Sequence, residues 1–216
     1  MQHETAPGSD AHIATDAAKN VATDVAAGRS VAGSGYSAAI LLGLIVLYAA
    51  IALPVLTGKP APSGAFMAFG LLLATALVAL SLVDIATYRL PDIVTFPLAA
   101  LGIAIAHEMG WDIWWLRVAA AAAAFSAFVL IAWLYRQARG RQGLGHGDAK
   151  LMAAIGAWVG IEGLASVVLW SAASALVTIG MWRAAGGVVT KDMAIPFGPF
   201  LALGAWIVWL YGPVEL

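Results

Sequence analysis

Apolar stretches begin at Tyr36 and alternate with short polar, glycine-marked or proline-marked turns along the rest of the chain. Most of them approach the ~20 residues that a helix needs to cross a hydrocarbon layer about 30 Å thick. The two shorter stretches, 93–107 and 148–161, are expected to end inside the protein or at the membrane interface. The pattern predicts an all-α, polytopic membrane protein with about seven transmembrane helices, at 36–56, 65–84, 93–107, 116–135, 148–161, 163–182 and 195–211.

The first 35 residues differ from the rest of the chain, because they are rich in Ala, Asp, Thr, Gly and Ser. They lack the basic start, apolar core and small-residue cleavage site of a removable signal peptide. A weak amphipathic helix over 11–27 is one alternative, but it would offer little apolar area, so disorder or surface association is favoured. We predict a polar, disordered, cytoplasmic tail over residues 1–35 and a membrane-embedded domain over residues 36–216.

The composition agrees with this division, since 62% of the residues are hydrophobic and only 11% are charged. The net charge of −1 gives no basic face that would favour nucleic acid as a partner. The absence of cysteine excludes disulfides, cysteine-ligated metals and a thiol nucleophile. The histidines lack the paired spacing of a metal site, so we expect neither a metal nor a cofactor; they are His3, His12, His107 and His146.

The basic residues predict the orientation of the helices, because loops rich in Lys and Arg resist translocation. A cytoplasmic N-terminus and an outward C-terminus place nine of the 11 Lys and Arg residues inside and leave only Lys59 and Arg117 outside. Aromatic residues are then expected near the outer interface, in two groups: Trp111, Trp114 and Trp115, and Trp206, Trp209 and Tyr211.

Two acidic residues fall at the cytoplasmic ends of predicted helices. Asp84 closes the second stretch in LVALSLVDIATYRLPD, and Asp148 opens the fifth in GLGHGDAKL. An ionisable group at membrane depth is costly, which makes each a candidate functional residue. Two neighbouring carboxyl groups in a low-dielectric site cannot both ionise, so one keeps a proton while the other acts as a base. Such a pair can activate water against a peptide carbonyl without a metal.

Structural alternatives exist for both acids. Asp148 could simply be the N-terminal acid of a helix that follows a glycine turn, where the helix dipole favours negative charge. Asp84 could be a snorkelling or pore-facing acid paired with Arg89, which is itself most simply a cytoplasmic anchor.

Five further residues are candidates for shaping the site or binding a substrate. Gly145 and Gly147 allow a sharp turn and close approach of another chain segment. Asp92 is expected to be the N-cap of the third helix. Lys150 lies on a different face of the helix from Asp148 and is expected to reach headgroups or to tune the local field. Arg89 is the fifth candidate.

Three stretches resemble the type IV prepilin peptidases, also called leader peptidases. DIATYRLPDIVTFPL resembles their first signature, GHGDAKLMAAIGAWVG resembles the second, and IPFGPFLALGAWIVWLYG resembles their closing segment, all in the family's order. The resemblance implies that Asp84 and Asp148 match the catalytic pair of a Gly-x-Gly-Asp aspartic endopeptidase. It further implies a bacterial cytoplasmic-membrane enzyme that acts on prepilins or type II secretion pseudopilins, whose short basic leader precedes a hydrophobic helix.

One feature departs from the best-known bacterial members of this family. Those enzymes carry a cytoplasmic domain with Cys-x-x-Cys motifs after the first span and also methylate the new N-terminus. Here a short loop, 57–64, follows the first span, and cysteine is absent. The resemblance therefore implies peptidase activity and does not extend to N-methyltransferase activity, as in the short peptidases of tight-adherence pili or archaeal preflagellins.

Two other functions account for buried aspartates in a membrane protein. A transporter or ion-conducting protein would carry them near the midplane and show an internal repeat, and neither feature is visible in the sequence. A presenilin-like intramembrane protease shares Gly-x-Gly-Asp but uses a Pro-Ala-Leu sequence near its dyad, whereas this chain has IPFGPF.

Overall fold

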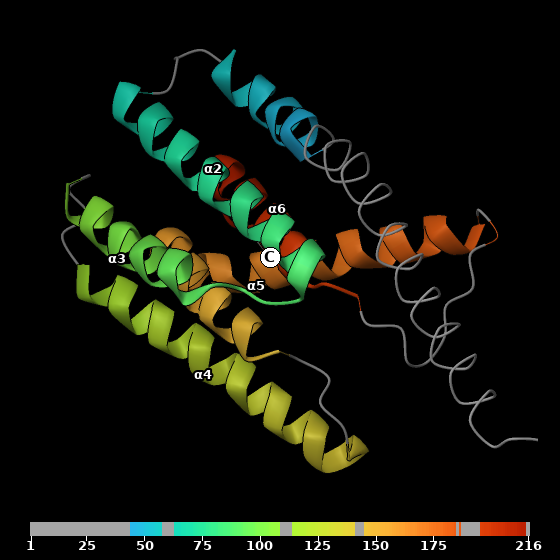
Figure 1. The fold of residues 1–216 in the computed structure, drawn as a ribbon. Coiled ribbons are helices and arrows are strands. Elements are labelled where there is room, and N and C mark those ends of the chain that lie inside the picture. Colours follow the sequence, from blue (N-terminus) through green and yellow to red (C-terminus); the bar gives the residue numbers. More distant parts are fainter. Residues whose placement is uncertain are drawn as a thin grey trace, which may run out of the picture. The chain divides into compact units, whose positions relative to one another are not determined.

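The computed structural model describes residues 44–57, 63–108, 114–140, 145–184, 186 and 195–214, and all regular structure among them is helical (Figure 1). The predicted tail, residues 1–35, lies outside the described residues, and Leu44–Leu216 form a compact unit by themselves. The all-α prediction is confirmed. The helices are Leu44–Leu56, α2 (Gly64–Thr87), α3 (Asp92–Glu108), α4 (Trp114–Arg139), α5 (His146–Ala184) and α6 (Gly198–Tyr211).

Three of these helices, α2, α4 and α5, are long and apolar enough to cross a membrane, and the others are shorter apolar helices. Much of their outward surface is apolar, with Leu71 70% and Leu176 69% exposed. A surface of this kind suits lipid, in which a helix satisfies its own backbone hydrogen bonds. The helices therefore support a polytopic membrane protein, while the orientation of the spans stays a prediction.

The fifth and sixth predicted segments are the two halves of α5. Gly160 interrupts the helix with φ 76° and ψ 179°, a conformation that favours glycine. The two halves run in different directions (Figure 1). Because the break removes a normal helical partner, the carbonyl of Trp158 is available to Arg117 of α4, whose Nη1 donates to it at 2.9 Å.

α5 contacts α3, α4 and α6, so it is the central helix of the unit. Small residues allow these close approaches. A Cβ atom on Gly156 would lie 2.9 Å from the backbone oxygen of Ala120 in α4. In the second half, a Cβ atom on Gly204 of α6 would lie 2.6 Å from the backbone oxygen of Val167. Glycine at such crossings is typical of membrane helices, which associate by close packing.

An aromatic cluster fills the core beside α6. The ring of Trp209 stacks on Phe66 and meets Trp158 edge-on, each at a centroid distance of 5.3 Å. Trp206 stacks on Tyr48 at 5.6 Å and donates its indole N–H to the backbone oxygen of the same residue at 3.1 Å. These contacts join the helix Leu44–Leu56, α2 and α5 to α6.

The expectation that Trp206 and Trp209 face the outer interface is wrong, because both rings are buried in this cluster. They sit on a short helix enclosed by its neighbours, so packing rather than the interface determines their surroundings. Trp114 and Trp115, at the start of α4, are exposed, as an interfacial position requires. Trp111 lies outside the described residues.

Candidate active site

Asp84 lies in the last turn of α2 and faces the protein interior. It continues the spacing of three or four residues that defines the buried face of the helix, formed by Leu73, Leu77, Leu80 and Ser81. Its side chain is only 5% exposed. The helix ends at Thr87, and the next residue, Tyr88, adopts a left-handed conformation (φ 54°, ψ 31°) and donates its N–H to the backbone oxygen of Asp84 at 2.8 Å.

The carboxyl group of Asp84 is bound by the start of another helix. Its Oδ2 accepts the backbone N–H of Gly198, the first residue of α6, at 3.0 Å. Among the described residues, no ion pair joins Asp84 to Arg89, so the alternative of an Asp84–Arg89 pair finds no support. Asp84 is thus an interior acid with a partner in a distant part of the sequence.

Asp148 lies in the first turn of α5, just after Gly145. Its Oδ2 accepts the N–H of Gly145 at 3.3 Å, which is the return contact that an acid in the third helical position makes in a capping box. The local alternative, a helix N-terminal acid after a glycine turn, therefore describes part of its environment. This alternative does not describe the whole environment of Asp148, because Asp148 also lines a cavity that Asp84 lines.

This shared cavity has a volume of about 610 Å³ and lies where α2 ends, α5 begins and the segment before α6 passes. The lining is mixed in chemistry, with charged, polar, aromatic and aliphatic groups: Asp84, Tyr88, Arg89, Leu90, Gly145, His146, Gly147, Asp148, Lys150, Ile195, Pro196 and Phe197. The two acids that the sequence singles out thus line the same cavity.

A glycine maintains the close approach of the two acid-bearing segments. A Cβ atom on Gly147 would lie 3.2 Å from Cβ of Leu90 and 3.4 Å from its Cδ1. Leu90 belongs to the turn between α2 and α3, immediately after the helix that carries Asp84. A larger residue at position 147 would therefore separate that turn from the start of α5.

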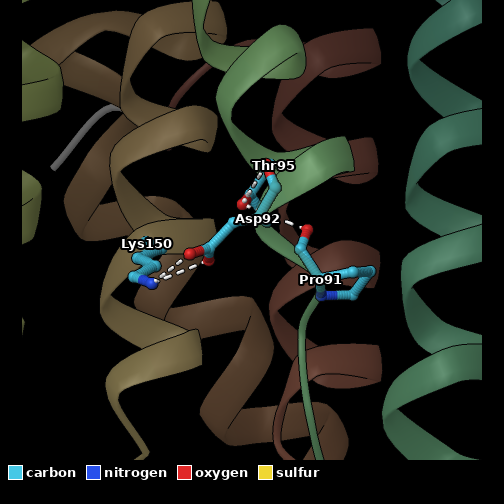
Figure 2. Close-up of polar contacts among 4 residues, drawn as sticks. All are labelled: Pro91, Asp92, Thr95 and Lys150. Carbon is cyan, nitrogen blue, oxygen red and sulfur yellow. Dashed lines mark hydrogen bonds and ion pairs between the residues drawn. The ribbon is translucent and has the colours of Figure 1, made fainter.

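An ion pair joins Lys150, which lines the cavity, to Asp92 (Figure 2). The ammonium of Lys150 donates to both carboxyl oxygens of Asp92, at 2.7 and 2.8 Å, which joins α5 to the first residue of α3. Both side chains are partly exposed, at 32% and 51%. Lys150 is thus ion-paired to another helix at a partly exposed position, and the expectation that it reaches headgroups or tunes the local field stays a prediction.

The expectation that Asp92 caps α3 is wrong. The helix begins at Asp92, and it is the carbonyl of Pro91 that accepts the N–H groups of Val94 and Thr95, at 3.1 and 3.2 Å. The hydroxyl of Thr95 also donates to this carbonyl, at 3.3 Å (Figure 2). A charge-assisted bond to an ammonium is stronger than a bond to a neutral amide, which explains why the Asp92 carboxylate binds Lys150.

The sequence model of the type IV leader peptidase family matches residues 71–180. The chain belongs to this family. It is 36% identical over 144 residues to the prepilin leader peptidase/N-methyltransferase of Xanthomonas campestris pv. campestris, covering 66% of this chain and 49% of that protein. The proteins of the same name from Burkholderia pseudomallei and Aeromonas hydrophila are 38% and 34% identical, covering 70% and 66% of this chain and 48% and 49% of their own length.

The chain spans about half the length of these curated relatives. No solved structure matches it significantly. The part that matches the leader peptidase family contains both Asp84 and Asp148 and ends before α6 begins.

Of the residues predicted to shape the site, Arg89, Gly145, Gly147 and Lys150 line the cavity, and Asp92 contacts Lys150. The sequence resemblance matched IPFGPF to the closing segment of the family but gave its first residues, Ile195, Pro196 and Phe197, no place in the site; they complete the lining. It also gave no role to Gly198, although the motif IPFGPF contains it. Among the described residues, no group of three or more His, Asp or Glu side chains is arranged to hold a metal ion.

Proposed function

We propose that this chain is a membrane aspartic endopeptidase that removes the leader peptide from type IV prepilins or type II secretion pseudopilins. One observation carries the proposal: Asp84 and Asp148, from separate helices, line one cavity. Membership of the leader peptidase family and the names of the relatives support the substrate class. The N-methyltransferase part of those names is not included, since the chain spans only half of the relatives' length.

The two carboxyl groups divide the work of hydrolysis. One is ionised and takes a proton from a water molecule, which attacks the carbonyl carbon of the scissile bond. The other is protonated and hydrogen-bonds to the carbonyl oxygen as negative charge develops there. Collapse of the tetrahedral intermediate breaks the C–N bond, and a proton passes to the leaving amine. Mutual repulsion of two carboxylates in a confined site maintains this division.

The location of the acids supports cleavage at the cytoplasmic face. Asp84 lies in the last turn of its helix and Asp148 in the first turn of its own, so neither is near the middle of a span. Basic residues accumulate at this end: Arg89 and Lys150 line the cavity, and Arg136 of α4 lines a small neighbouring one together with His146. Basic residues favour the cytoplasmic side of a membrane. A transporter would instead carry its acids near the midplane.

The ion pair between Lys150 and Asp92 has a positioning role in this proposal. It links the start of α3 to the start of α5, two residues beyond Asp148. The turn that precedes Asp92 leads directly from the helix of Asp84. The pair therefore restrains the two acid-bearing segments relative to each other. It also engages the Lys150 ammonium, which is then less available to pair with Asp148.

Leader removal from a prepilin in a host that lacks its own prepilin peptidase tests the proposal. Asp84→Asn and Asp148→Asn each keep the size of the side chain and remove its acid–base function, so each should abolish processing while the protein stays in the membrane. Glu162→Gln is the matched control, because it changes a carboxylate next to the break in α5, and it should process normally. Cleavage that persists in either aspartate variant would reject the catalytic pair.

A further inference from the structure

The hydrogen bond between Gly198 and Asp84 joins residues 114 positions apart and is buried. It joins the first residue of α6 to an acid that lines the cavity. The family match ends at residue 180, so it gives α6 no role. Gly198 donates from the main chain, and no side chain of α6 is involved in the bond.

The local structure of α6 explains why this N–H is available. The first N–H groups of a helix have no partner within the helix. Phe200 and Leu201 satisfy theirs at the backbone oxygen of Phe197, each at 3.1 Å. Pro199 has no N–H at all. Gly198 therefore supplies the one main-chain donor of this first turn that is left for a group outside the helix, and the positive end of the helix dipole favours an anion there.

The space beside Asp84 explains why the residue is glycine. A Cβ atom at position 198 would lie 2.7 Å from Oδ2 of Asp84, 3.0 Å from its Cγ and 3.3 Å from its Cβ. Asp84 is almost fully buried and cannot retreat without disturbing its surroundings. The backbone of Gly198 does not adopt a left-handed conformation, so the requirement for glycine is steric. Any side chain would push the carboxyl group out of its place.

We propose that Gly198 is a positioning residue for Asp84. Its N–H holds Oδ2 in a fixed orientation and leaves Oδ1 for the reaction, and its missing side chain lets the helix end come within hydrogen-bonding distance. This inference rests on the proposed function, in which Asp84 is one of the two catalytic acids. It adds a third chain segment to the two that carry the acids, so the site is complete only when α6 is packed in place.

Gly198→Ala tests the proposal, with Gly204→Ala as its matched control. The control makes the same change six residues along α6, where a Cβ atom would lie 2.5 Å from Oγ of Ser171 and 2.6 Å from the backbone oxygen of Val167. Both variants introduce a clash, but only the first displaces the acid. Gly198→Ala should lower kcat for leader removal by about 100-fold with KM nearly unchanged, since a displaced catalytic group costs rate more than binding. Gly204→Ala should keep kcat per folded molecule.

A normal kcat in Gly198→Ala, or an equal fall in both variants, would overturn the positioning role. An equal fall would mean that any disturbance of α6 packing slows the enzyme. A loss that occurs mainly in KM would also contradict it, because it would assign Gly198 to substrate binding.

Thermal unfolding in detergent tests the contact without using activity. Gly198→Ala should lower Tm, and most of this decrease should disappear in an Asp84→Ala background, where the clashing carboxyl group is gone. Gly204→Ala combined with Asp84→Ala should instead be additive. Additivity for Gly198→Ala would reject the contact. Non-additivity together with full activity of Asp84→Asn would keep the contact and reject the catalytic role of Asp84, so the two failures are distinguishable.

Discussion

Asp84 and Asp148 line the same cavity, but the protein holds them in different ways. The carboxyl group of Asp84 is bound by the N–H of Gly198, on a helix that lies 114 positions further along the chain. The carboxyl group of Asp148 is bound by Gly145, only three positions before it, at the start of its own helix. One acid depends on tertiary packing, whereas the other depends on a local turn.

This difference between tertiary support for Asp84 and local support for Asp148 predicts where substitutions are tolerated. A residue that pushes on Asp84 from another helix should be damaging, because the buried carboxyl group has no alternative position. Around Asp148, changes that preserve the turn should matter little. Disturbances elsewhere along α5 should also leave Asp148 in place, since its hydrogen bond lies within the first turn.

Outside Asp84, Asp148 and Gly198, the largest effect is expected at Gly147, which lies between the two regions. Gly147→Val would place atoms against Leu90, because even a Cβ atom at position 147 would lie 3.2 Å from Cβ of that leucine. The turn after Asp84 would then move away from Asp148, and kcat/KM for leader removal should fall about 100-fold. Adding Leu90→Ala should recover part of the rate by making space. A wild-type rate in Gly147→Val would show that the close approach is not needed.

A substitution at the break in α5 is expected to reduce stability clearly and to leave catalysis unchanged. Arg117→Met removes the donor to the carbonyl of Trp158. The lost partner of a buried carbonyl should reduce the free energy of unfolding by about 1–3 kcal/mol, measured in detergent. Cleavage per folded molecule should not change, because Asp148 is held locally. A large fall in kcat would instead mean that the break controls the orientation of Asp148.

A smaller effect is expected at the ion pair between α3 and α5. Lys150→Met and Asp92→Asn should each slow leader removal by up to about fivefold, since a partly exposed pair contributes about 1 kcal/mol or less. Exchanging the two charges, with Asp92→Lys and Lys150→Asp together, should recover much of the loss. Failure of the exchange to improve on Lys150→Met would indicate that Lys150 acts through something other than Asp92.

The smallest effect is expected for Gly145→Ala. The backbone N–H that binds Asp148 remains, and the added Cβ atom would lie 3.4 Å from Oδ2, an ordinary contact distance. Processing should remain within about twofold of wild type, and stability should fall by no more than about 1 kcal/mol, because alanine is a poorer N-cap residue than glycine. This variant should be assayed beside Gly198→Ala. Each variant replaces by alanine the glycine whose N–H binds one of the two acids, Gly145 for Asp148 and Gly198 for Asp84. Equal losses in the two variants would remove the distinction between local and tertiary support.

The helices could be predicted from the sequence because their signals are local. The stretches 65–84 and 93–107 correspond to Gly64–Thr87 and Asp92–Glu108, and the break at Gly160 lies at the junction of the predicted segments 148–161 and 163–182. Apolar runs and the glycines and prolines between them are enough to locate such boundaries. The two acids could be found for the same reason, since a charge at the end of an apolar run stands out.

The interior surfaces of the helices could not be predicted in the same way. In a membrane protein, both the lipid-facing and the core-facing residues are apolar, so hydrophobicity does not tell one face from the other. Trp206 and Trp209 were therefore expected at the interface and are in the core. The ion pair of Asp92 with Lys150 spans 58 positions, and the bond from Gly198 to Asp84 spans 114. Only the packed helices bring such partners together.

A cross-linking measurement tests most directly whether positions 84 and 148 face each other in the cavity. The chain has no cysteine, so the double variant Asp84→Cys, Asp148→Cys carries the only two thiols. The control pair is Asp148→Cys, Trp114→Cys, because Trp114 lies at the end of α4 remote from Arg136 and the cavity, roughly 30 Å away by helical rise.

Treatment of membranes with a short bismaleimide, followed by mass spectrometry, should yield the cross-linked peptide pair in the 84/148 variant and none in the control. Single-site maleimide labelling would verify that all thiols react. Reactive thiols at 84 and 148 that never cross-link would contradict a shared site for the two acids.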